Sequence, residues 1–161
     1  MAESGGAPAD PDAGKPLPDR LKSKSPISRA NALADVAKMC AESDVSAPIF
    51  KDMIDKWKTI LADSHPLALE RAQESLAAFI NKVQPSLLIP YQPTIVKVLI
   101  EKGLTNAKKP IKEKALENIL LMFEVSETFD EDAITALQDM CKHKNVKVKF
   151  LISRILTTLF C

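Results

Sequence analysis

The sequence predicts an all-α protein, an α-solenoid of about four stacked helix pairs. Apolar residues recur at the 3.6-residue spacing of helices along most of the chain. After residue 16 a single glycine, Gly103, remains, whereas a fold with many tight β-turns needs more. Four short polar or basic turns also recur, each running into an apolar helical stretch. The third residues of successive turns lie 40, 44 and 36 residues apart, at or near the HEAT-type period of about 40 to 47 residues.

The recurrent turns are quartets expected between the two helices of each pair. They are Lys24–Ile27, Ser64–Leu67, Lys108–Ile111 and Lys144–Lys147. In an array of stacked helix pairs, equivalent turns follow one another along a continuous edge, and such edges commonly carry the function. The quartets are therefore the first candidates for a binding site.

Eight helices are expected, in four pairs. In chain order they cover Leu17–Lys22, Ser28–Ala41, Pro48–Leu61, Leu69–Ile80, Ile95–Ile100, Ile111–Phe123, Asp130–Cys141 and Val148–Phe160. Pro48 suits a first helical turn, where a backbone N–H is not needed. Pro85, Pro90 and Pro93 predict a connecting segment, and Gly103 predicts a helix end. The run from Ile95 to Ile100 also suits a buried strand, but the regular pairing favours a helix.

The composition fits one intracellular domain. At 161 residues the chain can bury a core, and with 46% hydrophobic but only 5% aromatic residues, aliphatic side chains must do most of the packing. Cys40, Cys141 and Cys161 are odd in number and lack Cys-x-x-Cys spacing, which argues against a disulfide framework or a zinc ribbon. No apolar run approaches the roughly 20 residues of a bilayer span, and the N-terminus does not resemble a signal peptide. We therefore expect a cytoplasmic protein without a membrane partner.

The first 16 residues are expected to form a disordered tail ahead of a single domain at residues 17–161. This tail contains three glycines and three prolines and has almost nothing to bury. At the other end, the last helix has a broad apolar face with Leu151, Ile155 and Leu159, and no polar capping repeat follows it. That face is expected to be covered by further repeats, by self-association or by another protein.

Half of the basic residues gather at three of the four turns, although the formal net charge is only +1. They are Lys22, Lys24, Arg29, Lys108, Lys109, Lys112, Lys114, Lys142, Lys144, Lys147 and Lys149. Their recurrence predicts a basic ridge for an acidic protein surface, and lysines that merely solubilise exposed turns are the simpler alternative. Nucleic acid would favour more arginines and interleaved aromatic residues, so we expect no nucleic-acid partner.

We expect neither an enzyme nor a bound cofactor. His65 and His143 are the two histidines, and no set of Cys, His, Asp and Glu converges on either at a spacing typical of metal ligands. A glycine-rich phosphate loop and a Ser/His/Asp set are also missing from the sequence. Trp57 shares an apolar stripe with Met53 and Leu61, which predicts a place in the core.

Several short motifs follow one another in the order found in a known family. They are Leu17-Pro18-Asp19-Arg20-Leu21 with Lys24 and Arg29 after it, Ala62-Asp63-Ser64-His65 with Glu70 and Ala72 after it, Leu104–Lys109, Leu121–Val125 and Lys144–Lys147. Together they resemble the TOG domains of the XMAP-type microtubule polymerases, in particular the first TOG domain of such proteins. The resemblance spans residues 17–160.

This resemblance implies a flat HEAT-repeat paddle whose intra-repeat turns bind the αβ-tubulin heterodimer, in a protein of the microtubule cytoskeleton, spindle or centrosome. The candidate tubulin-binding residues are Lys24, Pro26, Ile27, Arg29, Leu67, Lys108, Lys109, Lys112, Lys144 and Lys147. Two departures from the family predict weaker binding or a scaffolding role. The first-turn tryptophan of the family falls at Pro26 or Ile27, and loss of an aromatic anchor costs roughly a few kcal/mol. The full domain of the family has six repeats, against four here.

A generic HEAT scaffold is the alternative function. It would bind another helical protein through the face of Leu151, Ile155 and Leu159 rather than through the ridge. The two hypotheses predict opposite binding surfaces, so that changes on the ridge and on the last helix distinguish them.

Overall fold

The computed structural model describes residues 8–126, 130–142 and 144–160, without the side chain of Leu159. Every regular element in these ranges is helical, which confirms the predicted all-α fold. The elements are α1 (Leu17–Leu21), α2 (Pro26–Glu42), α3 (Pro48–Met53), α4 (Trp57–Ile60), α5 (Pro66–Ile80), α6 (Pro85–Leu88), η1 (Ile89–Tyr91), α7 (Gln92–Val98), η2 (Leu99–Leu104), α8 (Lys109–Ser126), α9 (Glu131–Met140) and α10 (Val146–Phe160).

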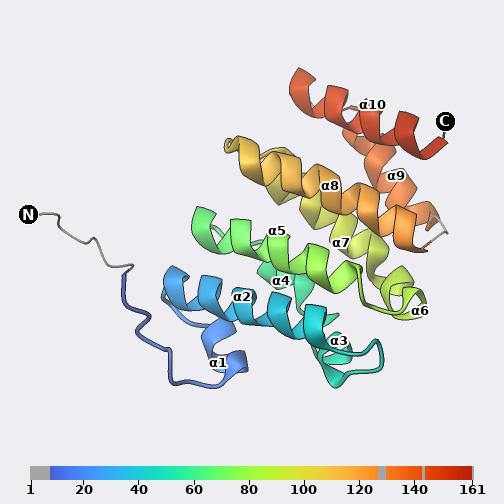
Figure 1. Cartoon of the computed structure of the whole chain (residues 1–161). Helices are drawn as coiled ribbons and strands as arrows, with labels where there is room; N and C mark the ends of the chain where they lie inside the picture. The colour runs from blue at the N-terminus through green and yellow to red at the C-terminus, as the bar shows by residue number, and fades with distance from the viewer. Residues whose placement is uncertain (1–7, 127–129, 143, 161) are drawn as a thin grey trace, which may run out of the picture.

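The helices stack in two layers (Figure 1). The long helices α2, α5, α8 and α10 lie side by side in one layer, and all four begin at the same edge, on the left of the figure. The shorter helices α1, α3 with α4, α7 with η2, and α9 form the second layer behind them. Each turn that leads from the second layer into the first therefore reaches the same edge of the molecule.

The core between the layers is mainly aliphatic and contains one small aromatic cluster. Trp57 is fully buried, and its ring meets that of Phe79 edge-on at a centroid distance of 5.3 Å. Phe79 also contacts Phe50, with their centroids 5.5 Å apart. Cys40 is buried as well, and burial raises the pKa of its thiol to about 11. The sequence-based placement of Trp57 in the core is confirmed.

Two stretches differ from the helices that the sequence predicts. The expected single helix from Pro48 to Leu61 is divided into α3 and α4, because residues 54–56 form a turn. The expected proline-rich connector is itself helical. Pro85, Pro90 and Pro93 lie in the first turns of α6, η1 and α7, where the missing N–H of proline has no helical partner to lose.

Gly103 is the penultimate residue of the π-helix η2, which ends at Leu104, one residue beyond the helix end that the sequence predicted. A Cβ atom built on Gly103 would lie 2.4 Å from the Cβ of Ala115 and 3.2 Å from Nε2 of Gln73. Two carbon atoms do not pack at 2.4 Å, so the close approach of η2 to α8 depends on the absence of a side chain.

Residues 8–16 lie against the start of α2, although the sequence predicted a disordered tail up to residue 16. The hydroxyl of the buried Ser28 donates a hydrogen bond of 2.5 Å to Asp10, and the Asn31 side chain donates one of 2.9 Å to the same carboxylate. These two donors, Ser28 first, lower the pKa of Asp10. The contact is polar and is made by a single carboxylate, that of Asp10, with a buried hydroxyl. Such a contact produces no pattern of apolar residues in the sequence, so the composition of the tail did not indicate it. Residues 1–7 lie outside the described ranges.

The last helix already buries much of the face that the sequence left uncovered. Ile155 is fully buried in the core cluster, Leu151 is partly buried and packs against that cluster, and α10 packs on α8 and α9. Among the described side chains of α10, the large apolar ones that are exposed are Val146, Phe150 and Phe160. The prediction that Ile155 is available for docking of another protein is therefore wrong, since neighbouring helices cover this side chain. Leu159 falls outside the described side chains.

Candidate functional site

The four turns share one geometry at the start of the long helices. In each, the fourth helical residue donates its N–H to the carbonyl of the residue before the helix, in the pairs Arg29 to Ser25, Leu69 to His65, Lys112 to Lys108 and Lys149 to Asn145. The third helical residues, Ser28, Ala68, Ile111 and Val148, are all buried. The first helical residues Pro26, Pro66, Lys109 and Val146 are therefore equivalent. The third quartet, which the sequence aligned on Pro110, is shifted by one residue.

In the first three turns a side chain accepts the N–H of the residue just before the helix, and in the fourth turn a side chain accepts the N–H of the second helical residue; in each case the acceptor lies two residues earlier. The bonds are Ser25 N to Ser23 Oγ at 3.0 Å, His65 N to Asp63 Oδ1 at 2.8 Å, Lys108 N to Asn106 Oδ1 at 2.9 Å and Lys147 N to Asn145 Oδ1 at 2.9 Å. Ser, Asp and Asn side chains shape turns in this way because they replace a backbone acceptor. The turns thus have a defined shape before any partner arrives.

Lysines of the predicted ridge extend from these turns into solvent. Those with no ion pair among the described residues are Lys22, Lys24, Lys108, Lys112, Lys144, Lys147 and Lys149, and all of them are exposed except Lys112, which is partly exposed. Lys109 is exposed as well and lies 3.6 Å from Glu113, an exposed pair that contributes little energy. The first, third and fourth turns therefore place net positive charge along one edge, which we call the basic ridge.

Lys114 was counted in the same cluster, but its ammonium is held by carboxylates on the neighbouring helix. It contacts Glu74 and lies 3.8 Å from Glu70, both on α5. These contacts tie α8 to α5 and remove Lys114 from the free charge of the ridge.

Arg29 joins the first turn to the second. Its Nε donates to Asp63 Oδ2 at 2.7 Å and its Nη2 donates to Asp63 Oδ1 at 3.0 Å. Its Nη1 donates to the carbonyls of Ser23 at 2.8 Å and Lys24 at 3.2 Å. One guanidinium thus fixes the backbone of the first turn to the carboxylate that shapes the second, as the planar fork of arginine allows. The sequence placed Arg29 at the ridge but did not reveal Asp63 as its partner.

The Arg29–Asp63 pair is largely shielded from water, with side-chain exposures of 18% and 12%. Burial alone would raise the pKa of Asp63, but the hydrogen bonds from Arg29 and from the His65 N–H outweigh it and hold this pKa below its usual value. Because the folded-state pKa is lowered, the stabilisation is complete above the unfolded-state pKa of about 4 and is lost as the pH falls through the lower folded-state value.

Asp63→Asn is therefore expected to lower the free energy of unfolding by about 1 to 2 kcal/mol at pH 7, because it removes a charged, bidentate acceptor. Urea denaturation at pH 7 and again near pH 3 measures the effect, and the gap between wild type and variant should narrow at the lower pH. Asp35→Asn is the matched control, since Asp35 pairs with Arg20 at 2.6 Å but is 52% exposed. Equal losses at both sites, or a gap that does not depend on pH, would contradict the assignment.

The apolar part of the ridge lies at the second and fourth turns rather than the first. Leu67 is 40% exposed in the second turn, and Val146 is 76% exposed in the fourth. Pro26 and Ile27, which stand where the resemblance places a tryptophan, are both partly exposed. The sequence-based site omitted Val146, although this valine belongs to the fourth quartet. An apolar residue at the start of an apolar helix can be buried or exposed, and the sequence pattern does not show which.

The structure reveals no metal-binding arrangement in the ranges that it describes, since no group of three or more His, Cys, Asp and Glu side chains is placed to hold an ion. His65 uses Nδ1 to accept the Leu67 N–H at 3.3 Å at the start of α5, and His143 lies outside the described residues. Cys141 is partly buried, and Cys161 is not described. None of the described helices has the length and hydropathy needed to cross a bilayer.

Two layers of stacked helix pairs, joined by shaped turns along one edge, place this chain among the HEAT-type α-solenoids. Known proteins narrow the class further, because the sequence profile of the family described as XMAP215/Dis1/CLASP, TOG domain, matches residues 13–161. The chain therefore belongs to this family of TOG domains.

Two curated relatives carry the similarity. The chain is 32% identical over 109 residues to Centrosomal protein 224 of Dictyostelium discoideum, an alignment that covers 67% of this chain and 5% of the relative. It is 29% identical over 82 residues to the spindle pole body component alp14 of Schizosaccharomyces pombe, covering 51% of this chain and 10% of that protein. The chain thus spans a tenth or less of the length of these relatives.

Two solved structures share the fold. The first is described as the structural basis of tubulin recruitment and assembly by microtubule polymerases with TOG domain arrays. It matches 87% of this chain and 30% of its own with a TM-score of 0.76 at 20% identity. An engineered protein matches 89% of this chain and 60% of its own with a TM-score of 0.56 at 16% identity. At these identities the likeness concerns the helical solenoid.

Proposed function

We propose that this chain is a non-catalytic module of the microtubule cytoskeleton that binds αβ-tubulin through its basic ridge. The observation that carries the proposal is the equivalence of the four turns, three of which place lysines at one edge. Membership of the TOG family, and relatives named for the centrosome and the spindle pole body, support both the partner and the location.

Binding follows from charge and shape on this ridge. The exposed lysines attract an acidic partner over a distance of about a Debye length, and the fixed turns then set its register. Leu67 and Val146 add apolar contact at the second and fourth turns. Arg29 acts here by holding the first turn in place, because its guanidinium is already engaged by Asp63 and two carbonyls. A contribution to microtubule dynamics would follow from delivery of tubulin bound in this way.

Charge reversal on the ridge tests the proposal. The double variant Lys109→Glu/Lys147→Glu is expected to bind soluble αβ-tubulin at least about tenfold more weakly at low salt, because both lysines are exposed at the start of a long helix. Folding should suffer little, because glutamate in a first helical turn is favourable and offsets the loss of the exposed Lys109–Glu113 pair. Analytical ultracentrifugation with purified tubulin measures the affinity, and the difference should shrink as salt is added.

Lys38→Glu/Lys51→Glu is the matched control, with the same change of charge at exposed positions away from the four turns. Tubulin binding that survives reversal on the ridge, or that falls equally in the control, would rule out the ridge as the tubulin site. Absence of binding by the wild-type chain would rule out the function itself.

A further inference from the structure

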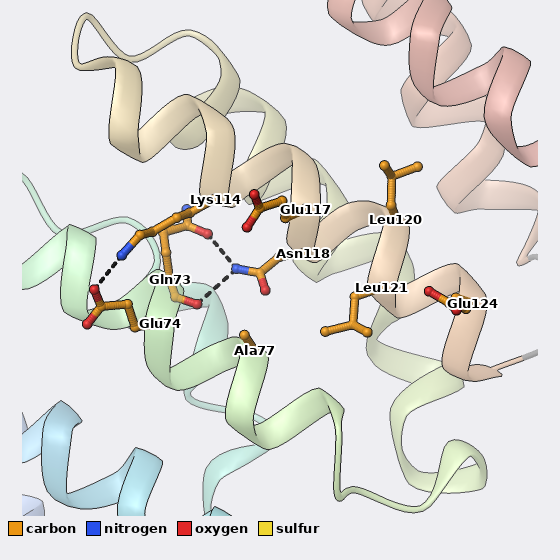
Figure 2. A pocket seen from close by; sticks show the side chains of 9 residues that line it. All are labelled: Gln73, Glu74, Ala77, Lys114, Glu117, Asn118, Leu120, Leu121 and Glu124. Atoms are coloured by element: carbon orange, nitrogen blue, oxygen red, sulfur yellow. Dashed lines mark hydrogen bonds and ion pairs between the residues drawn. The ribbon is translucent and has the colours of Figure 1, made fainter.

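A groove of about 540 Å³ runs between α5 and α8 on the outer surface of the long-helix layer, away from the four turns (Figure 2). It is lined by Gln73, Glu74, Ala77, Lys114, Glu117, Asn118, Leu120, Leu121 and Glu124. Neither the basic ridge nor the core explains this surface, which combines carboxylates with partly buried apolar side chains.

The charge of the groove is acidic and lies mostly on α8. At one end Lys114 is engaged by Glu74 and Glu70, and Glu74 also accepts a 2.7 Å bond from Arg71. Glu117 and Glu124 are exposed and form no ion pair among the described residues. Because they are seven residues apart on one helix, about two turns, both project along the same side of the groove.

The floor between these two carboxylates is apolar. Ala77 on α5 and Leu121 on α8 point toward one another there and are partly exposed, enough to contact a ligand without destabilising the free chain, whereas Leu120 borders the groove but projects away from α5 (Figure 2). An amphipathic helix offers the complementary pattern when it carries leucines between two cationic residues that are also about two turns apart.

Asn118 supplies a polar group that is already oriented. Asn118 is only 2% exposed, and its Nδ2 donates at 2.9 Å to both the carbonyl and the Oε1 of Gln73. These two bonds fix the amide, and Figure 2 shows its oxygen turned away from Gln73, on the side of the groove where Ala77 lies. This oxygen accepts no hydrogen bond from the described residues, so a fixed acceptor remains for a donor that enters the groove.

We propose that the groove between α5 and α8 is a second binding site, for a basic amphipathic helix of a partner protein. Arginine or lysine side chains of the partner pair with Glu117 and Glu124, and its leucines pack on Ala77 and Leu121. The carbonyl oxygen of Asn118 accepts one further hydrogen bond. The site is independent of the basic ridge, so the chain can hold an acidic partner at its edge and a basic one on its outer face.

The probe is a synthetic helical peptide with arginines seven residues apart and leucines between them, titrated into the isotope-labelled chain and followed by NMR. Saturable shifts are expected at the amides of Ala77, Asn118 and Leu121. Glu117→Lys/Glu124→Lys should weaken the binding at least about tenfold. Ala77→Met should weaken it as well, because it fills the floor without changing the charge. A peptide with glutamate in place of arginine should not bind.

The matched control is Glu42→Lys/Asp52→Lys, the same change of charge at exposed acidic residues outside the groove. The proposal would be overturned if the peptide showed no saturable binding. It would also be overturned if the shifts were spread over other acidic surfaces, or if the control lost binding equally, since either result would indicate unspecific attraction between unlike charges. Lys109→Glu/Lys147→Glu should leave peptide binding unchanged, and Glu117→Lys/Glu124→Lys should leave tubulin binding unchanged. Failure at one site is thereby separated from failure at the other.

Discussion

Ile155→Glu is expected to lower the free energy of unfolding by at least about 3 kcal/mol, because it places a carboxyl group at a fully buried position in the last helix. Burial of the charged carboxylate is costly. Protonation avoids that cost, but at neutral pH it also requires free energy and therefore lowers the stability of the folded chain. Urea denaturation at pH 7 measures the loss.

Phe150→Glu is the control on the same helix. Phe150 is 62% exposed, so this change should alter stability by about 0.5 kcal/mol or less. If both variants were equally stable, α10 would not pack on α8 and α9 as described. The comparison also shows why Ile155→Glu is no test of partner binding through this face, since the variant would lose binding by unfolding.

Gly103→Ala is expected to lower the free energy of unfolding by about 1 to 3 kcal/mol, although the same change at an exposed helical position is stabilising by roughly 0.5 to 1 kcal/mol. The reversed sign arises because the new methyl group would meet the Cβ of Ala115 at 2.4 Å. Neither carbon belongs to a flexible side chain, so η2 and α8 must move apart. Thermal and urea denaturation of the single variant measure the cost.

A second substitution distinguishes this steric clash from a general intolerance of change. Ala115→Gly alone should cost about 1 kcal/mol of helix propensity. Combined with Gly103→Ala it removes one of the two clashing carbons, so the double variant should be more stable than the sum of the single effects predicts. Strict additivity would show that the two residues do not meet.

The sequence was sufficient for the features that depend on local patterns. Helical periodicity located the long helices, and the helix expected from Asp130 corresponds to α9, where Asp130 accepts the N–H groups of Asp132 and Ala133. Recurrent turns predicted the pairing of helices and the common edge. Such signals lie within a few neighbouring residues, so they can be read without knowledge of the tertiary contacts.

The features that sequence reasoning missed depend on residues far apart in the chain. Arg29 and Asp63 are 34 positions apart, and nothing in the first turn indicates that its arginine serves the second. The role of Gly103 follows from the close packing of Ala115, and the burial of Ile155 follows from α8 and α9. A helical wheel shows which residues share a face, but the neighbouring helices decide whether that face is covered.

The common direction of the long helices has an electrostatic consequence for the ridge. α2, α5, α8 and α10 all start at this edge (Figure 1), and the N-terminus of each helix carries about half a positive elementary charge from its aligned peptide dipoles. These partial charges add along the edge, also at the second turn, where Ser64–Leu67 contains no lysine. They belong to the backbone, so they persist when the lysines are replaced. Part of the positive potential of the ridge thus arises from the common orientation of the four long helices and not from side chains.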